Sequence, residues 1–196
     1  MLATRSSVTS RRTLFRRVFG WFVGLGFVDR ARAQKIGDEA RKARPQKGDV
    51  FVHAVGNRKG QLVRVVDLEI GGPQAICYAK EPYTGVVRDG SRLNQVVLVR
   101  LDPEGLAGAT RAASAEGVVA YSAICPHTGC DVSMWRAGSG NLLCSCHDSE
   151  FDPRDGARVT TGPAPRRLPS LPLAVRDGVV EASGGFDARV RFQREF

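Results

Sequence analysis

Short hydrophobic runs separated by turn residues occupy the chain from Asp49 onward, and they have the length of strands rather than of long helices. Ten prolines and twenty-two glycines are spread along the sequence and add frequent turn positions. The runs that predict strands are Asp49–Val55, Gln61–Ile70, Gln95–Leu101, Gly117–Ile124, Leu171–Arg176, Val179–Ala182 and Phe186–Phe192. The pattern therefore predicts an all-β domain of antiparallel strands over residues 49–196.

Local patterns refine this prediction. Hydrophobic and charged residues alternate through Phe186–Phe192, as in a strand with one buried face. The pair Asp177-Gly178 lies between two strand runs and is favoured in two-residue hairpin turns. Asp102–Ala115 is expected to form a short helix or an irregular excursion. A motif region over about residues 121–167 interrupts the strand pattern.

The N-terminal part of the chain has the composition of a targeting segment. Ser10-Arg11-Arg12-Thr13-Leu14-Phe15-Arg16 resembles the twin-arginine export signal of bacteria. An uncharged apolar run, Val18–Val28, follows it, and Ala31-Arg32-Ala33 resembles a signal cleavage site. Residues 1–33 are therefore expected to be a signal peptide or a retained anchor, with membrane association possible through residues 14–28. This segment predicts export to the periplasmic side of the inner membrane, and residues 34–48, which are polar and aperiodic, are expected to be a linker.

The net charge of +9 does not indicate a nucleic-acid partner. Residues 1–33 hold seven arginines and one acidic residue, which leaves 22 basic and 19 acidic residues in the rest of the chain. A mildly basic domain without a basic stripe interleaved with aromatic residues is not typical of nucleic-acid binding.

Two cysteine–histidine boxes carry the clearest chemical signal. Cys125-Pro-His127-Thr-Gly-Cys130 is followed by Cys144-Ser-Cys146-His147, and together they hold two of the three histidines and four of the five cysteines. Cys125, His127, Cys144 and His147 could bind a [2Fe–2S] cluster with two thiolates on one iron and two imidazoles on the other. A structural zinc site with two cysteines and two histidines is the alternative metal assignment, and a metal-free domain with two disulfides is a further one.

The boxes resemble those of Rieske iron-sulfur proteins, with their Cys-x-His, a gap of about sixteen residues, and Cys-x-x-His. The resemblance extends over about residues 49–192. It implies an antiparallel β sandwich or barrel base with an inserted cluster-binding subdomain. It also implies that Cys125 and Cys144 bind the inner iron, and that His127 and His147 bind the outer, more exposed iron.

The same resemblance assigns roles to neighbouring residues. Cys130 and Cys146 occupy the positions of the disulfide that joins the two loops in respiratory and photosynthetic members. Gly162-Pro163-Ala164-Pro165 matches the proline-rich loop that covers the cluster in quinol-oxidising members. Ser149 matches a serine whose hydroxyl donates a hydrogen bond to a bridging sulfide.

Three positions depart from the pattern of high-potential members. Phe151 replaces a tyrosine that donates to a ligand sulfur, and phenylalanine has no donor. Asp148 replaces a glycine and adds a negative charge beside His147. Both changes predict a reduction potential below the top of the Rieske range. Thr128 replaces a leucine at the docking tip, which weakens the case for docking on a quinol-binding subunit.

The resemblance implies a periplasmic electron-transfer subunit rather than a stand-alone enzyme. It is expected to pass single electrons from quinol to a cytochrome-type acceptor, with proton uptake through the ligand histidines, beside cytochrome b/c-type subunits. The alternative is the small subunit of an exported molybdenum oxidoreductase of the arsenite oxidase type, with a large molybdopterin subunit as partner. A Rieske oxygenase is excluded, because only His53 remains to build a second iron site. Cys77 is expected to be a buried, inert thiol, and Arg166-Arg167 to be either a solvated pair or a docking site for an acidic redox partner.

Overall fold

The computed structural model describes residue 30 and residues 32–193. The chain divides into two compact units, residues 1–39 and 40–196. In the first unit residue 30 and residues 32–39 are helical, and the second unit begins with helical residues 40–42, so part of the segment expected to be a linker is helix. The export motif and the apolar run Val18–Val28 lie outside the described residues. Among the described helices, none has both the length and the hydrophobicity needed to span a bilayer.

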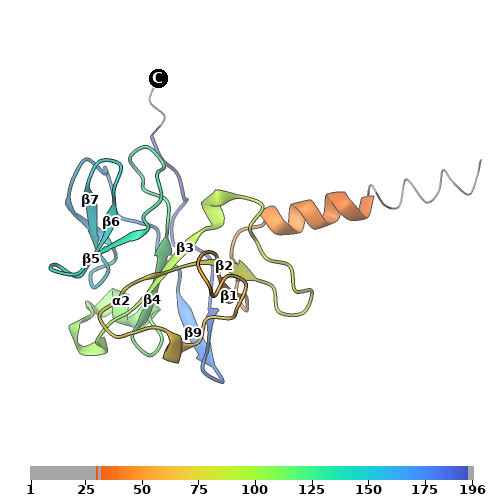
Figure 1. Ribbon diagram of the computed structural model, residues 1–196, viewed down its shortest axis with the longest axis horizontal. Coiled ribbons are helices and arrows are strands. Elements are labelled where there is room, and N and C mark those ends of the chain that lie inside the picture. The colour runs from red at the N-terminus through yellow and green to blue at the C-terminus, as the bar shows by residue number, and fades with distance from the viewer. Residues whose placement is uncertain (1–29, 31, 194–196) are drawn as a thin grey trace, which may run out of the picture. The chain divides into compact units, whose positions relative to one another are not determined.

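Two antiparallel sheets make up the second unit (Figure 1). The larger sheet has six strands in the order β4-β3-β2-β1-β10-β9. Its strands are β1 (Val50–His53), β2 (Ala75–Lys80), β3 (Val96–Arg100), β4 (Val118–Ser122), β9 (Leu173–Arg176) and β10 (Val179–Ala182). The smaller sheet comprises, in sequence order, β5 (Met134–Arg136), β6 (Asn141–Cys144), β7 (Ser149–Asp152) and β8 (Arg158–Thr161). It is inserted between β4 and β9, as expected for a cluster-binding subdomain.

Strands β3 and β4 are buried on both faces, and this places the inserted sheet. Alternate side chains of β3, such as Val96 and Leu98, belong to one hydrophobic core with Phe51 of β1. The intervening side chains, such as Val97, belong to a second core that includes Phe151 of β7. The second core therefore joins the two sheets, because residues of both contribute to it.

The all-β prediction is confirmed, and five of the seven strand runs contain a strand at the expected place. The hairpin is confirmed too, since Asp177 and Gly178 both have positive φ between paired Arg176 and Val179. The predicted excursion contains two short helices, η3 (Pro103–Gly105) and α2 (Gly108–Ala113). A further short helix, η2 (Arg92–Asn94), precedes β3.

Two strand predictions are wrong. Gln61–Ile70 makes only isolated bridges on either side of a short helix, η1 (Val65–Asp67), because the Asp67 carboxylate accepts the Arg64 N–H and turns the chain. Phe186–Phe192 forms no strand, because Asp187 accepts the Ser170 N–H and the backbone beyond it bonds to a loop. Strand β2 was not predicted, and neither were the four strands of the smaller sheet.

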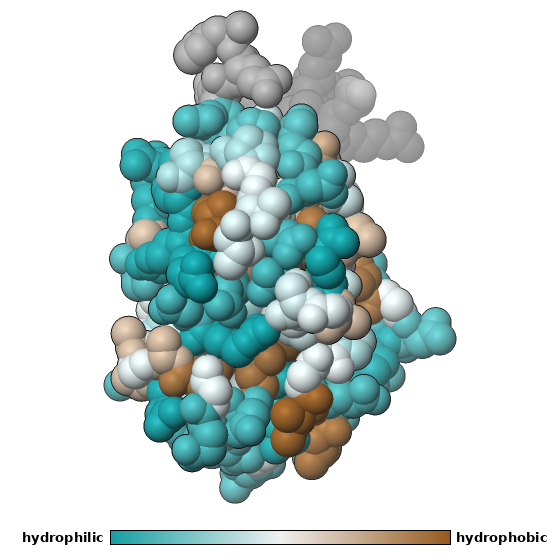
Figure 2. Space-filling view, turned by 90° about the vertical axis from the view of Figure 1, so that its left-hand side faces the viewer, coloured by the Kyte–Doolittle hydropathy of each residue, from teal (hydrophilic) through white to brown (hydrophobic). Residues whose placement is uncertain are grey.

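Figure 2 shows the face of the molecule that carries β5, β6 and β7 in Figure 1. Hydrophilic residues cover most of that face, and hydrophobic residues form small separate patches. Contacts made through this face therefore depend chiefly on polar and charged side chains.

Candidate metal centre

Two loops carry the cysteine–histidine boxes. The first follows β4, and it closes on itself through hydrogen bonds from the Cys125 N–H to the Cys130 carbonyl and from the Gly129 N–H to the Cys125 carbonyl. The second connects β6 to β7, and these two strands pair antiparallel, with Leu142 opposite Phe151 and Cys144 opposite Ser149. Each box is therefore a tight loop whose cysteine lies near the core and whose histidine lies toward the surface.

The structure brings the two histidines together. Nδ1 of His127 lies 3.2 Å from Nδ1 of His147, and the rings meet edge to face with centroids 4.6 Å apart. A tetrahedral metal with bonds of about 2.0–2.1 Å needs nitrogen ligands roughly 3.3–3.4 Å apart. The two Nδ1 atoms therefore have a separation that suits ligation of one metal ion.

The two unpaired cysteines of the boxes also face each other. Cys125 and Cys144 are 1 % and 2 % exposed, and their thiols are hydrogen-bonded to one another. This hydrogen bond from Cys125, with the N–H groups of Cys146 and His147, lowers the pKa of Cys144 to about 6. The same contact and burial raise the pKa of Cys125, whose sulfur also accepts from the His127 N–H and the Ser149 hydroxyl. One thiolate is thus stabilised at neutral pH, and both sulfurs have donors directed at them.

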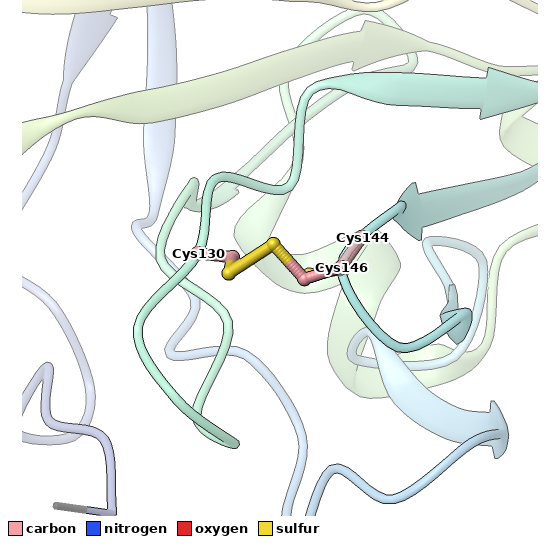
Figure 3. A group of neighbouring side chains, drawn as sticks. All are labelled: Cys130, Cys144 and Cys146. Carbon is pink, nitrogen blue, oxygen red and sulfur yellow. A yellow bond between two sulfur atoms is a disulfide. The ribbon is translucent and has the colours of Figure 1, made fainter.

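A disulfide joins the two loops, as the family resemblance implied. Cys130 and Cys146 are bonded across sixteen residues, with their Cα atoms 6.5 Å apart (Figure 3). Their sulfurs and that of Cys144 all lie within 4.8 Å of one another. Because two of these three sulfurs form the disulfide, they are not available as thiolate ligands. The donors that remain are the Cys125 and Cys144 thiols and the two imidazoles.

The proline-rich loop packs directly on the residues that follow the second box. Gly162 has a φ of 87°, and a Cβ placed on it would lie 2.5 Å from the Ser149 Cα. The Ala164 N–H donates to the Ser149 hydroxyl at 3.2 Å. Only glycine allows this approach, so residues 162–165 form a lid held against the loop of Cys144 and His147.

The C-terminal segment contacts the first box, which the sequence did not indicate. The Gln193 N–H donates to the His127 carbonyl at 2.9 Å. The Phe192 ring lies so close to Gly129 that a Cβ there would be 2.8 Å from it. Figure 1 shows this segment running beside the loop that follows β4. The alternation in Phe186–Phe192 was a real signal of one packed face, but the surface that it packs on is a loop and not a sheet.

The three departing residues have distinct local roles. Phe151 is fully buried and brings no hydroxyl to the site, which agrees with the expected loss of one donor. Asp148 has a φ of 54°, in the left-handed region that glycine adopts most easily. Aspartate is among the other residues that tolerate this region best. The Thr128 hydroxyl lies 3.7 Å from the Cys130 sulfur and so faces the disulfide.

Two other candidate residues lie outside the site. Cys77 is fully buried in β2, and burial raises the pKa of its thiol, which keeps it protonated and inert. His53 belongs to β1 and lines a separate pocket of about 340 Å³. Burial first, and the Arg58 charge second, lower the pKa of His53, which therefore stays neutral near pH 7.

Comparison with known proteins agrees with this donor set. The family model described as "Rieske [2Fe-2S] domain" matches residues 72–172. The cytochrome bc1 complex Rieske iron-sulfur subunit of Streptomyces lividans is 43% identical over 97 residues, which is 48% of this chain and 57% of that protein. A protein of Haloferax mediterranei, provisionally named as the Rieske subunit of a respiratory nitrate reductase, is 47% identical over 75 residues, 38% of this chain and 33% of that protein. The matches thus span from about a third to somewhat over half of these relatives.

A solved structure gives a further comparison at lower identity. The plasma membrane Rieske protein PetC3 of the cyanobacterium Synechocystis PCC 6803 is 31% identical, over 45% of this chain and 75% of that chain, with a TM-score of 0.34. The family match separates iron from zinc at this site, since a donor set of two thiols and two imidazoles suits either metal.

Proposed function

Because the chain belongs to the Rieske [2Fe-2S] domain family, we propose that it is the electron-transfer subunit of a quinol oxidoreductase complex. The family's [2Fe–2S] cluster is the cofactor. In this proposal Cys125 and Cys144 hold the inner iron, and His127 and His147 hold the outer one. The observation that carries the assignment is the 3.2 Å approach of the two Nδ1 atoms, together with two buried free thiols that are hydrogen-bonded to each other.

The cluster supplies one-electron chemistry at a potential of roughly −150 to +300 mV, because two of its ligands are neutral. The chain's own groups adjust that potential. The backbone N–H groups of His127, Cys146 and His147 and the Ser149 hydroxyl all donate to ligand sulfurs. Such donors favour the reduced state. The lid at residues 162–165 keeps water from the thiolate side.

The two imidazoles give the site a route for protons. Their Nδ1 atoms face each other, so Nε2 lies on the other side of each ring. His147 is exposed and His127 half-buried. We expect Nε2 of one of them, once it has lost its own proton, to accept the proton of a quinol hydroxyl.

The proposed donor, acceptor and location draw their support from the relatives and from the N-terminal motif. The Streptomyces relatives are named as subunits of a cytochrome bc1 complex, which supports quinol as donor and a cytochrome as acceptor. The twin-arginine motif at Arg11-Arg12 supports the periplasmic side of the membrane. The lid and the disulfide also support quinol oxidation, because the family resemblance assigns both features to its respiratory or quinol-oxidising members.

A second candidate is a Rieske subunit in another exported oxidoreductase, such as a molybdenum enzyme of the arsenite oxidase type. The Haloferax relative favours a partner other than a bc1 complex, because it is named for a nitrate reductase. Thr128, a small polar residue at the expected docking tip, supports the same alternative.

Spectroscopy of three histidine variants tests the cluster assignment. We expect the purified protein to be reddish brown and, when reduced, to give an EPR signal of low average g. His127→Ser and His147→Ser should lose that signal, and His53→Ser, the matched control, should keep it. A colourless protein containing zinc, or a signal that survives in His147→Ser, would contradict the assignment.

Purification from the native membrane separates the two complexes. A partner subunit with b-type haem, together with reduction of the cluster by quinol, supports the first candidate. A large molybdopterin subunit, with no reduction by quinol, supports the second.

A further inference from the structure

Four arginines line one concave surface beside the lid. Arg166, Arg167, Arg189 and Arg191 surround a pocket of about 380 Å³, with Pro169 and Ala188 completing its lining. Arg166 and Arg167 follow the lid directly in sequence, and Arg189 and Arg191 come from the C-terminal segment. We call this set the arginine pocket.

Little negative charge balances the arginine pocket. Asp187 pairs with Arg167 at 3.0 Å, and its carboxylate also accepts the Ser170 N–H. Within residues 32–193, Arg189 and Arg191 are exposed and form no ion pair. The charge of Arg189 also acts beyond the pocket, since burial first and then this charge lower the pKa of Arg44.

The arginine pocket adjoins the candidate metal centre. Nη2 of Arg166 donates to the Arg191 carbonyl at 2.7 Å, which fastens the end of the lid to the C-terminal segment. Two residues later, the Gln193 N–H bonds to the His127 carbonyl at 2.9 Å. The positive surface is thus connected, through three consecutive residues, to a loop that carries a proposed metal ligand.

Four like charges around one hollow repel each other, and the repulsion is relieved when a partner brings carboxylates into it. A charged surface of this kind also steers an oppositely charged partner, and it can raise association rates by roughly ten- to a thousandfold. Electron transfer needs close approach, and this surface is joined to the backbone of His127 through Gln193. A redox protein guided here would arrive next to the site.

We propose that the arginine pocket is the docking surface for an acidic electron-transfer protein that exchanges electrons with the cluster. This inference rests on the proposed function and names the chemistry of its partner. The carboxylates of that protein pair with Arg189 and Arg191, which form no ion pair within the part of the chain that the structure describes. Arg166 and Arg167 form the side of the pocket next to the lid.

Stopped-flow oxidation of the reduced, cluster-loaded full chain tests the proposal. The oxidants are a cytochrome c of net negative charge and a cytochrome c of net positive charge. The test variant is Arg189→Gln/Arg191→Gln, and the control Lys59→Gln/Arg176→Gln removes the same charge from positions outside the pocket. Potential, EPR signal and thermal denaturation are recorded for each protein, so that damage to the cluster or fold is recognised separately.

At about 20 mM ionic strength, the test variant should react roughly tenfold more slowly with the acidic cytochrome, and the control less than twofold more slowly. Its rate should also depend less steeply on salt, and its rate with the basic cytochrome should not fall. Calorimetric titration with the oxidised acidic cytochrome should show a matching loss of affinity. Because this titration requires no electron transfer, it tests docking even if the protein lacks the expected cluster, a result that would sink the proposed function alone.

Equal losses of rate and affinity in the test and control variants would overturn the proposal, since net charge alone would then explain them. Sedimentation with phosphatidylglycerol vesicles distinguishes a membrane surface from a protein partner. If the test variant loses vesicle binding and keeps its rate with the acidic cytochrome, the occupant is an anionic lipid surface, and the proposal is wrong.

Discussion

Ser149 connects the lid to the metal centre, and replacing it tests how this connection acts. Its side chain is 1 % exposed at the start of β7. The hydroxyl donates to the Cys125 sulfur and accepts the Ala164 N–H at 3.2 Å. Ser149→Ala therefore removes a donor from a proposed ligand and an acceptor from the lid, with only one atom lost from the core.

The two losses have separable magnitudes. A hydrogen bond contributes about 1 kcal/mol net, and a donor to sulfur favours the more negative, reduced state. For a one-electron couple a tenfold change, or about 1.4 kcal/mol, corresponds to 59 mV. We therefore expect the potential to fall by about 40 mV. The Ala164 N–H, left buried without an acceptor, should lower the free energy of unfolding by about 1–3 kcal/mol.

Redox titration followed by circular dichroism gives the potential, and thermal denaturation gives the stability. Ser145→Ala is the matched control, because Ser145 is an exposed serine in the same loop. It should leave both quantities almost unchanged. An unaltered or higher potential in Ser149→Ala would refute the reasoning about the sulfur, even if the protein were less stable.

Three further changes probe the frame around the site. Replacing both Cys130 and Cys146 with alanine should lower the free energy of unfolding by about 3 kcal/mol, from the loop of sixteen residues that they close, as measured by denaturant titration. Gly162→Ala should cost about 1–3 kcal/mol, since its Cβ would meet backbone of the residues that follow the second box, and the cluster's EPR signal should broaden or shift; an unchanged signal and stability would contradict the packing. Asp49→Asn should cost about 3–5 kcal/mol in thermal denaturation, because Arg88, 6 % exposed and 2.6 Å from Asp49, would lose its charged partner. A neutral outcome there would show that Arg88 reaches water.

The candidate ligands could be placed from sequence because each box is local. The spacing within Cys125–Cys130 and Cys144–His147 brings cysteine and histidine onto one short loop, whatever the rest of the chain does. The pairing of the loops with each other came from the family resemblance, and the disulfide between Cys130 and Cys146 confirms it. That pairing is a long-range contact, which no local pattern contains.

Five strands of the larger sheet were predicted from sequence, whereas β2 and the four strands of the smaller sheet were missed. Runs that are buried on both faces, such as β3 and β4, are continuously hydrophobic and easy to recognise. The short strands of the smaller sheet have mixed sequences, and Ser149–Asp152 includes two acidic residues. They form because each pairs with its neighbour in sequence, and because β6 and β7 bury side chains such as Leu142 and Phe151 in the core shared with β3.

The two ligand loops are held from opposite sides by segments that are distant in sequence. The lid bonds to the second loop through Ser149, and the C-terminal segment bonds to the first through the His127 carbonyl. Arg166 then ties the lid to the C-terminal segment at Arg191, and the disulfide ties the loops to each other. These contacts form a closed ring of four segments: the lid, the two ligand loops and the C-terminal segment. Movement of either histidine loop therefore disturbs the contacts of the other three segments. Two of the four arginines in the arginine pocket, Arg166 and Arg191, belong to that ring, so in our proposal a protein bound there contacts the same segment that bonds to the His127 carbonyl.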